Sequence, residues 1–479
     1  MHASWVLHPD RAFPAEPGTR AIARALHAQV AHLPIVSMHG HIDAELIASD
    51  ANFTDPASLL VTPDHYLVRM LVSQGIPMTE LMSAPAGSAP AEVTATSRAV
   101  WRLFCENWRL FRGTPTRYWL DHVLIDLFEL TAEPSAESTD LLFDDISAKL
   151  HDAAFRPRAL FDRFNLEVLA TTDSATSALE HHRTLAADGW GGRVIPTFRP
   201  DSLLHLGSAG WRQQLSRLEE LTDTETASFD GFLRALAERR RQFVAAGARA
   251  TDHGHDSASC ERLPIRVASA IFDRARAGDA VSLAETRAFA GSMLFEMARM
   301  SCNDGLVMQL HSGVLRNHDT RTHAKFGPDR GYDIPVAEEF TRSLRPILEA
   351  FGHHPTFRLV VFTVDEGTYT RELAPLAGVY PAMKLGAPWW FLDSPDGMRR
   401  FREAVTETAG FYNTTGFVDD TRAFCSIPAR HDLARRVDAS YLARLVAEHH
   451  LREDEAADVL IDLTSRIPRA SYPALMEMS

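Results

Sequence analysis

Cysteine, basic residues and long apolar runs are all scarce in this chain, and each scarcity excludes a class of protein. The four cysteines are far apart, at positions 105, 260, 302 and 425, and none forms a C-x-x-C pair. This spacing predicts free thiols in a reducing compartment rather than a disulfide framework. Lys and Arg total 49 against 63 Asp and Glu, which gives a net charge of −14. The acidic balance argues against nucleic acid or an anionic membrane as the partner.

A membrane span and a secretory signal are also missing from the sequence. No apolar run is long enough to cross a bilayer, and the N-terminal region carries Asp10 and Arg11 in place of an apolar signal core. We therefore expect a cytoplasmic protein. Its 479 residues, 45% of them hydrophobic, suffice for one large domain with insertions or two ordinary ones. A homo-oligomer is compatible with this composition, which identifies no interface.

What the sequence does contain is a short apolar run that ends in two histidines. Residues 33–43 read L-P-I-V-S-M-H-G-H-I-D, and residues 34–38 predict a buried strand. Alternate side chains of a strand face the same side, so His39 and His41 can point into one space, about 6–7 Å apart. Gly40 between them leaves room for another group. Two neutral imidazoles suit one divalent metal ion; two polar residues that cap a strand are an equally good interpretation of this motif alone.

A long helical region follows these histidines. Residues 44–164 combine helical spacing of apolar side chains with polar, proline-containing joints. Within it, residues 64–74 predict a helix that Asp64 opens by accepting hydrogen bonds from free amide groups. Residues 83–90, rich in Ser, Ala and Pro, predict a loop. Before the first strand, residues 21–32 predict one more helix.

From residue 165 onward the pattern changes to short apolar strands that alternate with helices. Together with the first strand, eight such segments occur, at residues 34–38, 166–170, 193–198, 248–250, 306–310, 359–364, 379–385 and 416–418. Helical segments lie between most of them, for example 211–246, 283–300 and 396–408. Eight strand–helix units predict an α/β fold, a distorted (β/α)₈ TIM-type barrel with a large helical insertion after its first strand.

This fold predicts how the chain is divided. We expect a single elaborated barrel domain over residues 1–479, with the helical insertion at 44–164 inside it. The remaining barrel strands and helices then occupy residues 165–435, and a helical C-terminal segment follows at 436–479. In such barrels the carboxyl ends of the strands meet at one mouth, where active sites form. The residues that follow the strands are therefore the candidates for function.

Polar and charged side chains follow most of the predicted strands. They are His39, His41, Asp173, Arg199, Asp252, His253, His311, Asp365, Asp420 and Arg422. Singly, each has a plain structural interpretation: an Asp can cap a helix, a His can belong to the core, and an Arg can lie in solvent. Barrel closure would bring them together and make the first and eighth strands neighbours. His39, His41 and Asp420 could therefore share a divalent metal ion.

Several motifs occur in an order typical of one family. After H-G-H come D-H-Y at 64–66, A-T-T-D at 170–173, P-T-F-R-P-D at 196–201, D-H-G at 252–254, Q-L-H-S-G-V-L-R-N at 309–317, W-W-F-x-D-x-x-D-G-M at 389–398 and D-D-T-R-A-F at 419–424. With this series the chain resembles the uronate isomerases of the amidohydrolase superfamily. Gly40 and Ala44 depart from the family's usual Cys and Pro, and residues 365–371 also differ. These departures indicate a divergent branch.

The resemblance implies an aldose–ketose isomerase of hexuronate catabolism. Such enzymes interconvert D-glucuronate with D-fructuronate, and D-galacturonate with D-tagaturonate, through an enediol. The chemistry needs a base for the C2 proton, charge stabilisation for the enediolate and a clamp for the carboxylate. The resemblance also implies a divalent metal ion, zinc, on His39, His41 and Asp420, with no nucleotide cofactor and a small sugar acid as the partner. It leaves the preferred uronate open.

The same resemblance assigns roles to residues of the barrel mouth. It makes Tyr66 the proton shuttle between C2 and C1, with Arg199 beside it to favour the phenolate of a side chain whose pKa is ordinarily about 10. Asp420 and His39 would act in ring opening and on the O1 and O2 hydroxyls. Arg422 would bind the carboxylate, since a planar guanidinium suits one. The other expected substrate-binding residues are His65, His311, Arg316 and Trp389.

Two other interpretations stay open at this point. A metal-dependent hydrolase of the same superfamily would use the metal to activate water, with Asp420 as proton acceptor. Such hydrolases often have a histidine after the sixth strand, where this chain has Asp365 and Glu366. A sugar-acid-binding protein without catalysis is the third interpretation. The intact set of Tyr66, Arg199, Asp420 and Arg422 argues against it. Tyr66 could also be a packed helix aromatic, and Trp389 a packing residue at the mouth.

Overall fold

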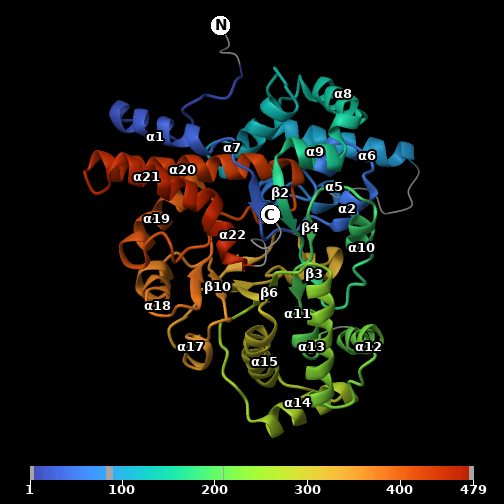
Figure 1. The fold of residues 1–479 in the computed structure, drawn as a ribbon. Helices are drawn as coiled ribbons and strands as arrows, with labels where there is room; N and C mark the ends of the chain where they lie inside the picture. Colours follow the sequence, from blue (N-terminus) through green and yellow to red (C-terminus); the bar gives the residue numbers. More distant parts are fainter. Residues whose placement is uncertain (1–4, 82–89, 209, 474–479) are drawn as a thin grey trace.

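The protein is described by a computed structural model that covers residues 5–81, 90–208 and 210–473, without the side chains of residues 90–95. A ring of short parallel strands occupies its centre, and helices surround the ring (Figure 1). The strands of the ring are β1 (Ile35–Ser37), β2 (Leu166–Ala170), β3 (Asp173–Ser174), β4 (Val194–Ile195), β5 (Phe198–Arg199), β6 (Ala250–His255), β7 (Val307–Ser312), β10 (Leu359–Phe362) and β11 (Met383–Leu385).

Two hydrogen-bonded sheets make up this ring, in the orders β1-β2-β4 and β11-β10-β7-β6-β5-β3. They belong to one barrel, because β2 continues into β3 and β4 continues into β5 after short interruptions. Pro196 explains the second interruption, since proline has no N–H to donate to a strand ladder. The strand predicted over 193–198 therefore occurs as two pieces. The predicted distorted barrel is confirmed.

The eighth position of the ring is occupied by backbone that is not a regular strand. The prediction of a strand at 416–418 is wrong; instead Thr414 bridges β11 on one side. On the other side, the segment just after β1 is hydrogen-bonded in both directions. The Asp420 amide donates to the His39 carbonyl (3.3 Å), and the His41 amide donates to the Thr421 carbonyl (3.0 Å). Gly416 and Asp420 have φ angles of 75° and 40°, which lie outside the extended region of a ladder. These hydrogen bonds close the barrel in place of a ladder.

Two strands near the barrel mouth are longer than predicted. β6 and β7 pair in parallel from Ala250 and Val307 to His255 and Ser312, whereas the apolar pattern places these strands at 248–250 and 306–310. The apolar pattern of β6 ends early because most of the residues after Ala250 are polar, although almost all of them are buried. Conversely, the strand predicted over 379–385 begins only at Met383. A short antiparallel pair, β8 (Val314–Leu315) with β9 (Ile334–Pro335), was not predicted.

Helices fill the predicted insertion between β1 and β2. They are α2 (Ala44–Ser49), α3 (Pro56–Leu60), α4 (His65–Ser73), α5 (Met78–Leu81), α6 (Pro90–Glu106), α7 (Pro115–His122), α8 (Thr139–Leu150) and α9 (Pro157–Arg163). Asp64 caps α4 as predicted, accepting from the amides of Tyr66 and Leu67 at 2.8 and 3.4 Å. The loop predicted over 83–90 lies outside the described residues, except that α6 begins at its last position.

Further helices cover the outside of the ring (Figure 1). After β3 these are α10 (Glu180–Ala187), α11 (Asp201–Leu204), α12 (Trp211–Thr222), α13 (Phe229–Ala245), α14 (Ile265–Ala277), α15 (Leu283–Asp304), α16 (Thr320–Phe326), α17 (Arg345–Phe351), α18 (Ala374–Ala377) and α19 (Pro395–Ala409). The chain continues with α20 (Ile427–Ala447), α21 (Glu453–Ile461) and α22 (Ile467–Ser471). Among the described residues, no helix combines the length and hydropathy needed to cross a membrane. The predicted boundary at 435/436 falls within α20, and the division into domains stays a prediction.

Alternate residues of the strands fill the inside and the outside of the barrel. Ala250 and Val307 pack inward with the apolar residues of β1, β2 and β10. Met308 and Leu310 pack outward against helix residues of α13 and α15. Because successive side chains of a strand face opposite sides, the residue two positions after Ala250 also points inward. That residue is Asp252, and the same reasoning places it on the interior side of the barrel mouth.

At the periphery, α1 (Pro17–Val30) packs along α20, so that helices from the first and the last parts of the sequence lie side by side (Figure 1). Asp432 of α20 is bound by Arg11 at 2.7 Å, His27 at 3.1 Å and Arg436 at 2.8 Å. Burial raises the pKa of Asp432. The hydrogen bond with His27 and the charges of Arg436 and Arg11 outweigh burial and hold this pKa well below its usual range.

The depressed pKa of Asp432 predicts a contribution to stability that is lost in acid. The contacts of Asp432 stabilise the folded state fully above about pH 4, near the pKa of an unfolded aspartate, and less as the pH falls toward the folded pKa. Replacing Asp432 by Asn should lower the free energy of unfolding by about 2 kcal/mol at neutral pH and by much less at pH 3. Thermal unfolding at both pH values measures the difference, and equal losses at the two would contradict this account.

Candidate active site

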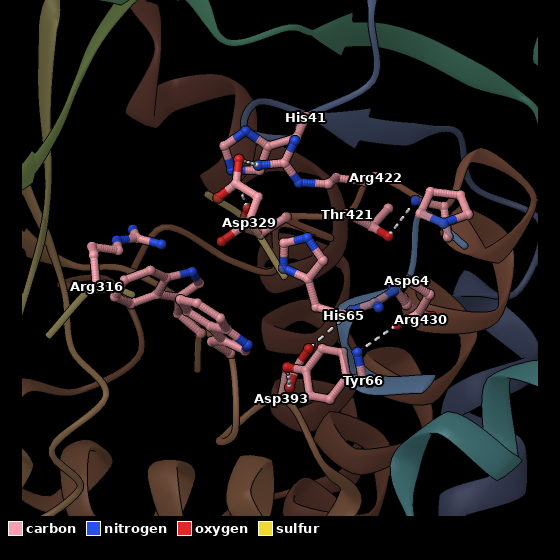
Figure 2. Close-up of a pocket in the computed structure, with 15 residues that line it drawn as sticks. His41, Asp64, His65, Tyr66, Arg316, Asp329, Asp393, Thr421, Arg422 and Arg430 are labelled. Carbon is pink, nitrogen blue, oxygen red and sulfur yellow. Dashed lines mark hydrogen bonds and ion pairs between the residues drawn. The ribbon is translucent and has the colours of Figure 1, made fainter. Parts of the chain in front are cut away.

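A cavity with about 620 Å³ of open space lies at the carboxyl ends of the strands (Figure 2). Its wall comes from the segment after β1, the start of α4, the loops after β8 and β11, and the segment that leads into α20. It includes most of the predicted site residues, whereas His39, Arg199 and His311 are not part of it. The wall consists of His41, Pro63, Asp64, His65, Tyr66, Arg316, Asp329, Trp389, Trp390, Asp393, Asp420, Thr421, Arg422, Ala423 and Arg430.

His39, His41 and Asp420 form what we call the inner metal group. Asp420 Oδ1 is 3.4 Å from His39 Nε2 and 3.1 Å from His41 Nε2. The two imidazole rings lie 5.4 Å apart at 82° to each other, and one ligand atom from each of the three residues lies within 4.8 Å of the others. Two imidazole nitrogens and a carboxylate oxygen are donors that suit zinc and similar ions. The inner metal group therefore fits a divalent metal ion.

The protonation tendencies of His41 and Asp420 agree with that fit, because a metal ion binds a neutral imidazole and an ionised carboxylate. Burial lowers the pKa of His41. Burial also opposes the charged form of His39, but the charges of Asp420 and Asp252 outweigh it and raise the pKa of His39. Burial raises the pKa of Asp420, yet the charge of His39 and the hydrogen bonds from both histidines hold it well below its usual range. The group thus contains an ionised carboxylate, the form in which a carboxylate binds metal.

Next to the inner metal group lies a second set of buried polar residues. His311 Nδ1 is 2.7 Å from Asp252 Oδ1, and Arg199 Nη1 is 3.5 Å from Asp252 Oδ2. The His311 ring stacks on His39 at 4.4 Å, and its Nε2 has no hydrogen-bond partner in the described part of the chain. His39, Asp252 and His311 also have ligand atoms within 4.8 Å of one another. His39 therefore belongs to two groups that could hold a metal ion.

Tyr66 lies at the other end of the cavity, in the first turn of α4 (Figure 2). Its hydroxyl donates to Asp393 Oδ1 at 2.7 Å, and Arg430 Nη1 donates to Asp393 Oδ2 at 2.9 Å. The Arg430 guanidinium also lies 3.6 Å from the centre of the Trp119 ring. Asp393 and Arg430 are only 6% and 3% exposed. A buried carboxyl group thus connects the phenol to a buried guanidinium.

The prediction that Arg199 lies beside Tyr66 and favours its phenolate is wrong. Burial and the negative charge of Asp393 raise the pKa of Tyr66 well above its usual value, against the charge of Arg430. Arg199, the predicted neighbour, instead binds Asp201 at 2.8 Å. Burial also raises the pKa of Asp393, against the charge of Arg430 and the hydrogen bond from Tyr66. Tyr66 is therefore a neutral phenol whose proton already points at a buried carboxyl group.

The mouth of the cavity carries two guanidinium groups. Arg422 Nη2 is 3.2 Å from Asp329 Oδ2, and Arg316 Nη1 is 3.0 Å from Asp333 Oδ2. Both arginine side chains are partly exposed, so a ligand can reach them. His65 projects toward the cavity between Arg422 and the Tyr66 end (Figure 2). Burial, with the positive charge of Arg422, lowers the pKa of His65 to about 4. His65 is therefore neutral at physiological pH.

The sequence analysis missed three charged residues of the wall that pair with predicted site residues or with one another. Asp393 had a signal, because it is the first Asp of the W-W-F-x-D motif, but the motif alone gives it no partner. Arg430 lies inside α20, and an arginine in a helix ordinarily faces solvent. Asp329 lies in a segment without apolar periodicity, between α16 and β9. Only the folded chain brings these residues to Tyr66 and Arg422.

Comparison with known proteins decides among the interpretations left open by the sequence. A family model described as glucuronate isomerase matches residues 18–466. The chain belongs to the glucuronate isomerase family. Uronate isomerases from Phenylobacterium zucineum and Rhizobium meliloti are each 52% identical to it, over 97% and 98% of this chain and 96% and 99% of theirs. The crystal structure of glucuronate isomerase from Caulobacter crescentus superposes with a TM-score of 0.94 at 47% identity and covers 98% of both chains.

Membership of this family confirms the predicted resemblance, and it shows that the chain is an enzyme. The superposition on the C. crescentus structure confirms the barrel over nearly the whole chain. The uronate isomerase of Thermotoga maritima has the same fold, with a TM-score of 0.90 at 26% identity, and covers 97% of this chain and 99% of its own. The roles of individual residues are not tested by these similarities and stay predictions.

Proposed function

We propose that this enzyme interconverts D-glucuronate with D-fructuronate, and D-galacturonate with D-tagaturonate, as an aldose–ketose isomerase. The observation that supports this most strongly is its similarity to uronate isomerases over nearly the full length of both chains. The cavity agrees with the proposal, since Tyr66, Asp420 and Arg422 line one space. The reaction needs a proton carrier, groups that act on O1 and O2, and a carboxylate clamp, and these residues can supply them.

We assign the transfer of the proton from C2 to C1 to Tyr66 acting together with Asp393. Tyr66 alone is a poor base at neutral pH, because its pKa is raised. Its proton can pass along the 2.7 Å hydrogen bond to Asp393, whose own pKa is raised by burial. Arg430 keeps a positive charge beside the pair. The phenolate then takes the C2 proton and returns it at C1, with the enediol between the two steps.

We assign the substrate carboxylate to Arg422, whose planar fork can bind both oxygens, with Arg316 as a second guanidinium at the mouth. The ligand would replace Asp329 as the partner of Arg422. Neutral His65 can exchange hydrogen bonds with sugar hydroxyls, as can His311 through its unpartnered Nε2. Trp389 provides an apolar wall for the sugar. Asp420 and His39 act on the proton of ring opening and on the O1 and O2 hydroxyls.

We further propose that the inner metal group holds a divalent metal ion and that the ion is zinc. Its nitrogen and oxygen donors are those that zinc accepts. A bound ion supplies Lewis acidity to a sugar oxygen, while Asp420 and the histidines fix its position. The enzyme would work in the cytoplasm on a free sugar acid, with no nucleotide cofactor and without a nucleic-acid or membrane partner. A homo-oligomer remains compatible with these assignments.

Proton NMR of the zinc-supplied enzyme with D-glucuronate in deuterated water tests the proposed reaction. We expect signals of D-fructuronate to appear, with little deuterium at C1, because a buried Tyr66–Asp393 pair would return the same proton. Full incorporation of deuterium would instead indicate a base that exchanges with solvent. If glucuronate, galacturonate and other uronates all stay unchanged, the isomerase proposal is wrong. Lactones and amides would then be tested as substrates of a hydrolase.

A further inference from the structure

The outer side of β6 carries two histidines that the proposed reaction does not use. Asp252 faces the barrel interior, where it binds His311. Since neighbouring residues of a strand face opposite sides, His253 and His255 face outward. Helix α11 lies against the same strand (Figure 1) and begins at Asp201. One ligand atom from each of Asp201, His253 and His255 lies within 4.8 Å of the others. We call these three residues the outer metal group.

Each residue of the outer metal group has a buried polar atom without a hydrogen-bond partner among the described residues. These atoms are His253 Nδ1, His255 Nε2 and Asp201 Oδ1. His253 is 0% and His255 5% exposed. Buried polar atoms in folded proteins are nearly always satisfied, so one unsatisfied atom on each of three clustered residues indicates a shared partner. A divalent cation can accept lone pairs from two imidazoles and one carboxylate at once.

The other polar atoms of the group are held as those of metal ligands usually are. His253 Nε2 is 3.0 Å from Thr251 Oγ1. Asp201 Oδ2 accepts from Arg199 Nε at 2.8 Å and from the Gly254 amide at 3.0 Å. Metal-bound histidines commonly donate their second N–H to an oxygen, and ligating carboxylates accept further hydrogen bonds. These contacts orient His253 Nδ1 and Asp201 Oδ1 and leave both atoms available for a ligand.

The charges around the outer metal group also favour a cation. Burial lowers the pKa of His253 to about 3 and that of His255 to about 4, so both rings are neutral at physiological pH and keep a lone pair. Asp201 and Asp252 share the single guanidinium of Arg199. Two carboxylates facing one guanidinium leave negative charge in excess. The guanidinium of Arg240, near His253, has its own carboxylate partner at 2.6 Å.

We propose that the outer metal group is a second divalent-metal site, on the outer side of the barrel wall. Two imidazole nitrogens and one carboxylate oxygen suit zinc, with a fourth position for water or for His205, whose ring lies 5.1 Å from that of His255. A bound ion fixes Asp201 from the outside. Because the second oxygen of Asp201 binds Arg199, the ion would also hold that guanidinium in position on the inner side. The site does not depend on the proposed reaction.

The zinc content of the purified protein tests this site directly. The protein is saturated with zinc and desalted, and the number of zinc ions per chain is then measured by inductively coupled plasma mass spectrometry. We expect about two zinc ions per wild-type chain, about one in His255→Asn or in His39→Asn, and none in the double variant, because His39 belongs to both groups on the inner side. His182→Asn is a matched control that should keep both ions. His182 is also buried and lies 3.8 Å from Asp173, but it belongs to no three-residue group among the described residues.

A second measurement does not require the His255 variant to fold. In His39→Asn both groups that contain His39 are disrupted, so among the three-residue groups of the described residues cobalt can occupy only the outer one. We expect one equivalent of Co²⁺ to produce the visible absorption of a four-coordinate site, and zinc to abolish it. The proposal is overturned if the wild type binds a single zinc ion, if His255→Asn binds as much zinc as the wild type, or if His39→Asn binds no metal.

Discussion

Replacing Tyr66 by phenylalanine is expected to lower the kcat of isomerisation by about 10²- to 10⁴-fold, the usual contribution of a positioned acid–base group. The variant keeps the ring that packs against Trp119, 5.6 Å away. It loses only the hydroxyl that donates to Asp393, and without it Asp393 has no group through which to act on the sugar. KM should change little, because the charges proposed to bind the carboxylate belong to Arg422 and Arg316.

A matched control for this variant is Tyr118→Phe. Tyr118 packs in the same hydrophobic cluster as Tyr66, and burial raises its pKa to about 12, but it is not part of the cavity wall. Its replacement should leave kcat close to that of the wild type. If Tyr66→Phe retains wild-type turnover in the NMR assay, Tyr66 is a packed helix aromatic and not the proton carrier. The same result would be expected of a hydrolase that works through metal-activated water.

The inner metal group could be predicted from the sequence, because two general rules place it. Alternation along a strand sets His39 and His41 on one side, and closure of a barrel makes its first and last strands neighbours. Neither rule needs side-chain detail. The structure adds that Asp420 reaches the histidines from a left-handed backbone conformation rather than from the end of a regular strand. The position of Asp420 was therefore predictable, although the backbone conformation that presents its side chain to the histidines was not.

The partners of Tyr66 could not be predicted in this way. Rules about strand ends say which residues lie at the mouth, but not which charges pair there. Arg199 ends β5 and binds two carboxylates on its own side of the barrel, whereas Arg430 comes from α20. Asp393, between two elements, decides the pairing because it binds both Tyr66 and Arg430. Such a pairing depends on long-range packing, which apolar periodicity does not record.

The buried pair of Asp393 and Arg430 leads to the second large expected effect. Arg430→Met leaves the Asp393 carboxylate buried without its counter-charge, and Asp393→Asn leaves the guanidinium unpaired. Removing one partner of a buried ion pair costs about 3–5 kcal/mol of folding free energy. We therefore expect both single variants to unfold at markedly lower denaturant concentrations. Asp393→Asn should also lower kcat about 10²-fold or more, because an amide cannot take the proton of Tyr66.

The double variant Asp393→Asn/Arg430→Met separates stability from catalysis. With both charges removed, its loss of folding free energy should be smaller than the sum of the two single losses, by about 1–3 kcal/mol. Its kcat should stay as low as that of Asp393→Asn, since the proton acceptor is still missing. Strictly additive losses in denaturant unfolding would contradict the ion pair. Wild-type turnover in Asp393→Asn would contradict only the proton transfer, so the two measurements test the structural and the catalytic role of Asp393 independently.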